Sequence, residues 1–150
     1  MAAVSGQGGF DRLARRFAAP AVMWLALLAL CAAYLQGGIQ KLLDFPGAVA
    51  ETAHFGLSPA TPVTVVTIVL ELGGSLAILL GRGRWLGALL LAGFTLLATF
   101  VANRFWDAPP VERFGLTNAF FEHLGLVGGF LLVAWHDLRA RGQGTSGSLP

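Results

Sequence analysis

Three side chains within apolar stretches of the sequence have the chemistry needed for proton transfer. Glu71 lies in the run "VTVVTIVLELGGSLAILL", and Glu122 and His123 stand together near the start of "FFEHLGLVGGFLLVAW". A charge inside a bilayer costs about 2.5–3.5 kcal/mol, so each is expected to be paired, protonated or turned toward a wet cavity. Buried carboxylates and imidazoles are also common proton-exchange groups. We therefore predict that Glu71, Glu122 and His123 are the catalytic, proton-handling residues of a polar pocket.

Four further side chains are candidates for holding a ligand beside these groups. They are Lys41, Asn103, Arg104 and Trp106. The cations would balance charge, the amide would form hydrogen bonds, and the indole, with neighbouring phenylalanines, would form an aromatic wall. A flat redox carrier such as a quinone needs donors and such a wall, so the set favours a quinone as ligand.

Other cofactors are less well supported by the residue pattern. His123 and His136 lie at opposite ends of one apolar run, and this spacing argues against haem. The chain has one cysteine, Cys31, so it cannot form an intrachain dithiol pair, and no paired-cysteine metal motif is present. We therefore predict no metal site.

Four apolar runs must position the candidate residues. The chain has 150 residues, of which 55% are hydrophobic and 12% charged, with a mean hydropathy of +0.69. Soluble domains are about one quarter charged, so this is the composition of a membrane protein. Because a membrane-spanning helix needs about 20 apolar residues and satisfies its own backbone, we predict an all-α, four-transmembrane-helix bundle. Its helices are expected at about 20–42, 62–80, 85–103 and 118–136.

Polar and small residues recur at helical spacing along one side of each predicted helix. Thr64, Thr67, Gly74 and Ser75 share the side of Glu71. The other sets are Tyr34, Gly37, Gly38 and Lys41; Thr95, Thr99, Asn103 and Trp106; and Asn118, Glu122, Gly125 and Gly129, with His123 alongside. Turning all four sets inward costs least, because the polar groups then satisfy one another. The sequence thus predicts a shared pocket near the outer face. The alternative is that the buried charges only fix helix register, while Lys41 and Arg104 extend to the head groups.

The cations indicate how the chain is oriented. Lys and Arg concentrate on the cytoplasmic side of membrane proteins. One side of the predicted bundle carries Arg12, Arg15, Arg16, Arg82, Arg84, Arg139 and Arg141. The other has only Lys41, Arg104 and Arg113. We therefore predict cytoplasmic termini for a multi-pass protein of the inner (plasma) membrane. Residues 1–19 would form a cytoplasmic lead, 20–137 the membrane domain with a short surface helix near 48–55, and 138–150 a disordered cytoplasmic tail.

Several motifs resemble those of the DoxX family of small four-helix membrane proteins. The sequence "GIQKLLDF" is followed by "FGLSP", "ELGGSLAILLG", "FWD" and "GLVGGFLLVA", over about residues 38–134. The resemblance implies a membrane partner of redox enzymes, since the name-giving member looks like a small subunit of a thiosulfate:quinone oxidoreductase. The chain departs from the family pattern at Asn103, where a histidine is expected, and at Glu122 and His123, where "KN" is expected.

Our leading hypothesis is a membrane subunit that supports a redox enzyme through a quinone-facing or proton-handling pocket near the outer face. The expected partners are the lipid bilayer and a protein of a redox complex, with no nucleic acid. The main alternative is a non-enzymatic scaffold or assembly factor, and a third is a carrier of small solutes or lipids. Whether the chain is active alone, and whether it forms homo-oligomers, stays open from sequence.

Overall fold

A computed structural model describes residue 11 and residues 14–146, and five helices make up most of the regular structure from residue 20 onward. They are α2 (Pro20–Leu43), α3 (Phe45–His54), α4 (Ala60–Leu80), α5 (Arg84–Ala102) and α6 (Pro110–Ser146). All except α3 are long and apolar enough to cross a membrane. The predicted all-α fold with four membrane helices is therefore confirmed. Most of the predicted lead (residues 1–10, 12 and 13) and residues 147–150 lie outside the described residues.

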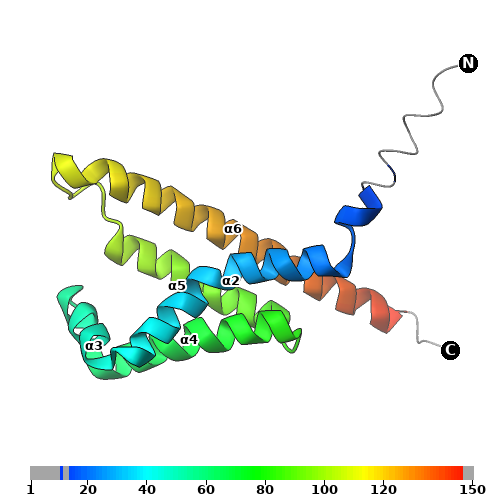
Figure 1. The fold of residues 1–150 in the computed structure, drawn as a ribbon, viewed down its shortest axis with the longest axis horizontal. Coiled ribbons are helices and arrows are strands. Elements are labelled where there is room, and N and C mark those ends of the chain that lie inside the picture. The colour runs from blue at the N-terminus through cyan, green and yellow to red at the C-terminus, as the bar shows by residue number, and fades with distance from the viewer. Residues whose placement is uncertain (1–10, 12–13, 147–150) are drawn as a thin grey trace, which may run out of the picture.

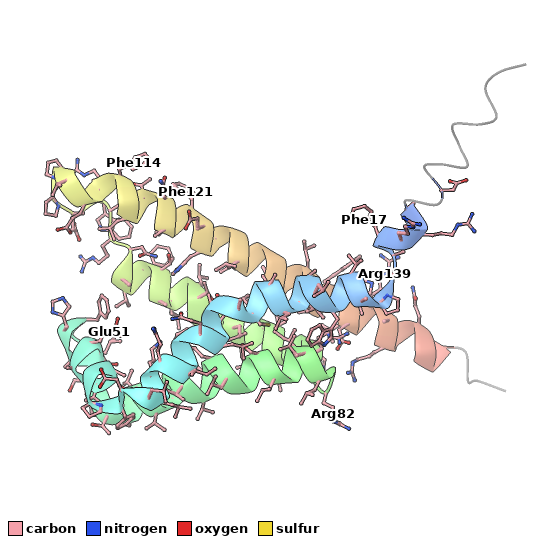
Figure 2. All side chains as sticks on the ribbon, in the orientation of Figure 1. Phe17, Glu51, Arg82, Phe114, Phe121 and Arg139 are labelled. Carbon is pink, nitrogen blue, oxygen red and sulfur yellow. The ribbon has the colours of Figure 1, made fainter. Side chains whose placement is uncertain are left out.

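The four long helices pack side by side with two distinct ends (Figure 1). Helix α4 contacts α2 and α5, and α5 also packs along α6. We call one end the arginine end, because it holds the α4–α5 turn with Arg82 and the last part of α6 with Arg139 (Figure 2). The opposite end, which we call the α3 end, holds α3 and the start of α6. Glu51 and Phe114 mark this end in Figure 2.

The half of the bundle toward the arginine end is closely packed. Its core consists of Leu27, Cys31, Tyr34, Ile78, Ala88, Leu91, Ala92, Phe130 and Ala134. Two glycines allow α4 and α5 to approach each other here, since a Cβ built on Gly87 would lie 2.7 Å from the carbonyl oxygen of Gly74. Small residues at such crossings are typical of membrane helix pairs, whose association depends on close packing.

A side-chain clasp holds α5 against α6 at the arginine end. The backbone N–H of Trp85, in the first turn of α5, donates to Oδ2 of Asp137 at 3.2 Å. The same carboxylate oxygen accepts from Nε of Arg141 at 3.0 Å. Asp137 thus satisfies a free backbone donor of α5 and is itself held by a cation one turn along α6.

Replacing Asp137 with alanine should destabilise the protein by about 1–2 kcal/mol, the range for losing a helix-capping side chain and its charge-assisted bond. Unfolding of the purified protein in detergent micelles measures this change. Glu112→Ala is the matched control, because Glu112 is exposed in the first turn of α6. Equal stability of the two variants would show that the clasp contributes nothing.

Helix α6 is longer than the sequence predicts. It runs from Pro110 to Ser146, so it begins eight residues before the expected start at 118, and residues 138–146, expected to be disordered, are helical. Contacts one turn apart extend it past the apolar run: Arg139 lies over the ring of Trp135, and Arg141 pairs with Asp137. At about 1.5 Å per residue the 37-residue helix is longer than the roughly 30 Å hydrocarbon layer.

Candidate functional site

An ion pair between α2 and α4 is the centre of the candidate site. Nζ of Lys41 donates to both carboxylate oxygens of Glu71, at 3.0 and 3.1 Å. The Glu71 side chain is 8% exposed and that of Lys41 is 23% exposed, so the pair is largely removed from the surroundings. An ammonium has three N–H donors, and two are used here. One remains for another acceptor.

Two consecutive glycines of α2 make room for this pair. A Cβ on Gly37 would lie 3.3 Å from Nζ of Lys41 and 3.6 Å from a carboxylate oxygen of Glu71. A Cβ on Gly38 would lie 2.7 Å from the side chain of Leu72. The glycines therefore let α4 approach α2 closely and let the lysine side chain fold back along its own helix.

A layer of hydrogen bonds and rings separates the ion pair from the core at the arginine end. The Tyr34 hydroxyl and the Thr95 hydroxyl form a hydrogen bond of 2.5 Å between α2 and α5. The Tyr34 ring packs edge-on against Phe130 of α6, with centroids 5.2 Å apart. Both aromatic residues belong to the packed core. The site is therefore closed on that side by tightly packed side chains.

His123 joins the site from α6 through Asn103, the residue that ends α5. The Asn103 side-chain amide lies 3.2 Å from Nδ1 of His123 and donates to the Thr99 hydroxyl at 3.1 Å. When Nδ1 accepts from the amide, a neutral imidazole carries its proton on Nε2. Asn103 thus orients the His123 ring and leaves its Nε2–H available to donate to another acceptor. The pairing of these two residues agrees with the sequence prediction that both contribute to one polar cluster.

A cavity of about 760 Å³ connects these groups. Lys41, Glu71 and His123 line it together with Tyr34 and Thr95, while most of the remaining lining is apolar. It lies between the α3-end halves of α4 and α5, with α3 and the residues after it along its edge. Ligand pockets are commonly about 300–1,000 Å³, so a small organic molecule fits by size.

The cavity is open on its side between α4 and α5. Val66 of α4 and Leu97 of α5 both line it, yet they are 57% and 72% exposed. Both positions lie within membrane-spanning helices. The lining of the cavity thus includes side chains on the exposed surface of two apolar helices.

The structure does not bring Glu122 into the site. Its side chain is exposed, and it does not line the cavity. Helix α6 instead turns His123, Phe130 and Ala134 toward the bundle. The bulk of Phe130, which is fully buried against Tyr34, sets this rotation. The predicted inward side of α6 is thus about one residue, or 100°, out of place.

Arg104 and Trp106 also lie apart from the cavity. Helix α5 ends at Ala102, so the helical spacing that joined Trp106 to Thr99 does not extend that far. Arg104 is exposed and pairs with Asp107 three residues later. Trp106 packs edge-on against Phe105 and Phe120, at centroid distances of 5.1 and 5.9 Å.

Helix α3 contributes to the cavity in a way that the sequence analysis missed. Glu51, Thr52 and Phe55 line it. A short helix was predicted near 48–55, and the structure has one at Phe45–His54, with Ala48 as its buried residue. Spacing provides the signal that was overlooked, because Glu51 and Phe55, the residue that follows the helix, lie four residues apart and therefore on the same side.

Comparisons with known proteins agree with the resemblance seen in the sequence. The DoxX family model matches residues 23–104, from α2 to the end of α5, a range that includes Lys41, Glu71 and Asn103. The chain is 24% identical over 117 residues to the inner membrane protein YphA of Escherichia coli (strain K12). The aligned residues make up 78% of this chain and 84% of that protein. No solved structure matches. The predicted location, a multi-pass protein of the inner membrane, is confirmed by this relative and by the four apolar helices. The family match spans more than half of the sequence, and the chain therefore belongs to the DoxX family.

Proposed function

We propose that this protein is a membrane subunit that supports a redox enzyme and binds a quinone in the cavity between α4 and α5. The observation that carries this proposal is the position of the Lys41–Glu71 pair in an apolar cavity of about 760 Å³ that opens sideways between two membrane helices. A quinone has a polar head and a long apolar tail. The cavity offers polar contacts for the first and a route to the bilayer for the second.

The donors in the cavity suit the two carbonyl groups of a quinone head. Lys41 keeps one N–H beyond the two that contact Glu71, and His123 presents its Nε2 proton when Nδ1 accepts from Asn103. Both residues line the same cavity, so one flat ring can accept from both. The tail would leave between Val66 and Leu97.

Proton handling falls to Glu71 and His123 in this proposal. Reducing a quinone to a quinol consumes two electrons and two protons, and the electrons would come from the partner oxidoreductase. Glu71 is held by Lys41, so a proton reaching the carboxylate weakens an existing bond, and the resulting carboxylic acid can pass that proton to the ring oxygen. The neutral His123 ring donates a hydrogen bond from Nε2; to transfer a proton it must first gain one and act as the imidazolium.

The same proposal places the α3 end outside the cytoplasm. Arg82 and Arg139 mark the arginine end in Figure 2, and cations favour the cytoplasmic side. The cavity would then exchange its ligand with the outer half of the bilayer, because the packed core closes it on the arginine side.

The scaffold alternative rests on the same ion pair, since Lys41–Glu71 joins α2 to α4 and would also fix their register. Glu71→Gln separates the two functions. Glutamine keeps the volume and can still accept from Lys41, so a pure scaffold should still assemble, although it loses some stability because the Lys41 charge loses its partner.

Binding of the short-chain analogue decylubiquinone to the purified protein in lipid nanodiscs tests the proposal. We expect His123→Leu to weaken binding about tenfold, the effect of losing one hydrogen bond to the ring. Glu71→Gln should also weaken binding, because the carboxylate no longer holds the Lys41 ammonium in place at the cavity. Glu112→Gln is the matched control and should bind as the wild type does, because Glu112 is exposed and does not line the cavity. A wild type without affinity, or a Glu71→Gln variant with full affinity, would overturn the quinone site and favour the scaffold.

A further inference from the structure

A cavity that opens into a bilayer faces a problem of selectivity. Its apolar lining and sideways opening, marked by the exposed Val66 and Leu97, suit the acyl chains of the surrounding lipids as well as any specific ligand. Membrane lipids are present in great excess over a redox carrier such as a quinone. The acidic lipids among them carry a net negative charge, and this charge is a property by which the cavity can reject them.

The charges along the cavity are not balanced. Lys41 and Glu71 compensate each other. Glu51 of α3 also lines the cavity, and within residues 11 and 14–143 its carboxylate takes part in no ion pair or hydrogen bond. Glu51 and Glu71 are close enough to interact electrostatically. With the imidazole neutral, the described lining therefore carries one net negative charge, contributed by Glu51.

The two arginines near the start of α6 form no ion pair with Glu51. Arg104 pairs with Asp107, and Arg113 donates to the carbonyl oxygen of Ala108. Neither arginine lines the cavity.

The fold holds Glu51 in place at the edge of the cavity. Its neighbour Thr52 donates to the Ala48 carbonyl at 2.9 Å and contacts the Thr64 hydroxyl of α4 at 2.8 Å. The start of α3 is fixed by Asp44, whose carboxylate accepts from the backbone N–H of Gly47 at 3.0 Å. Figure 2 shows Glu51 on α3 at the same end of the bundle as the start of α6.

We infer that Glu51 is a specificity-determining residue that makes the cavity prefer neutral or cationic head groups and exclude anionic ones. A phosphate entering beside Glu51 would meet an uncompensated like charge, whereas an ammonium would meet an opposite one and a quinone ring would be unaffected. The inference deepens the proposed function. It rests on that function in one respect only, which is that the cavity must accept an amphiphile. Its occupant is thereby distinguished from the acidic lipids that compete for the same opening.

Two amphiphiles with the same twelve-carbon chain test this inference. Dodecyltrimethylammonium and dodecyl phosphate are added separately to the full-length protein in a neutral maltoside detergent, and bound probe is counted by native mass spectrometry. We expect the wild type to bind the cation more tightly. Glu51→Gln should lower the ratio of cation to anion affinity about fivefold, the size expected for one charge acting over several ångströms in a partly hydrated site.

Glu112→Gln is the matched control, because it removes the same charge from an exposed position that does not line the cavity. Its ratio should equal that of the wild type. The inference fails if Glu51→Gln leaves the ratio unchanged, if Glu112→Gln shifts it equally, or if neither probe binds. A Glu51-dependent ratio in a protein that does not bind decylubiquinone would support the inference and overturn the proposed quinone.

Discussion

The Lys41→Met variant is expected to unfold with a free energy about 3–5 kcal/mol below that of the wild type, the cost of leaving one member of a buried ion pair without its partner. Glu71 is 8% exposed, and Lys41 provides its only side-chain ion pair in the described part of the chain. Methionine keeps the length and apolar character of the lysine stem. Equilibrium unfolding of the purified protein in mixed micelles measures the change.

The double variant Lys41→Met, Glu71→Met provides the control for this experiment. Replacing both charges removes the uncompensated carboxylate, and such replacements are often neutral or stabilising. We therefore expect the double variant to recover most of the lost stability. A double variant as unstable as Lys41→Met would contradict the assignment, because the cost would then come from packing instead of charge.

Gly87→Ala is expected to destabilise the protein by about 1–3 kcal/mol, the usual cost of adding a methyl group to a packed contact. The new Cβ would lie 2.7 Å from the Gly74 carbonyl oxygen and 3.0 Å from the Ala77 Cβ. The first is a backbone atom, which cannot rotate away, so α4 and α5 must separate. The melting temperature in detergent measures this change.

Gly93→Ala serves as the matched control in the same helix. A Cβ at Gly93 would have nothing within 4 Å. Alanine favours helix over glycine by up to about 1 kcal/mol, so this variant should be as stable as the wild type or more so. If both glycine variants behaved alike, close contact between α4 and α5 could not be the reason for Gly87.

The sequence was sufficient to predict the membrane helices and the need of Glu71 for a polar partner. The length of each apolar run fixed α2, α4 and α5 to within two residues, because the bilayer sets how long a spanning helix must be. The cost of an isolated charge at membrane depth required a partner for Glu71, and the polar side of α2 supplied Lys41. Asn103 and His123 also meet as predicted.

Helix rotation and helix ends were harder to predict. Glycine and polar residues lie along one side of α6, but the buried side is set by how Phe130 packs against Tyr34, a contact between distant parts of the chain. Trp106 was assigned to the pocket by continuing the spacing of α5 beyond Ala102, where the helix ends. Glu51 was missed because its importance depends on where α3 lies relative to α4.

Photolabelling with an azido-quinone tests most directly whether the cavity between α4 and α5 is a quinone site. The probe is added to the protein in nanodiscs, activated by light, and located by peptide mass spectrometry, with decylubiquinone as competitor. We predict competed labelling of cavity residues such as Val66 and Leu97 that disappears in Glu71→Gln. Labelling of the exposed side of α6 around Phe121, or labelling that the competitor and the Glu71→Gln change leave untouched, would contradict the account.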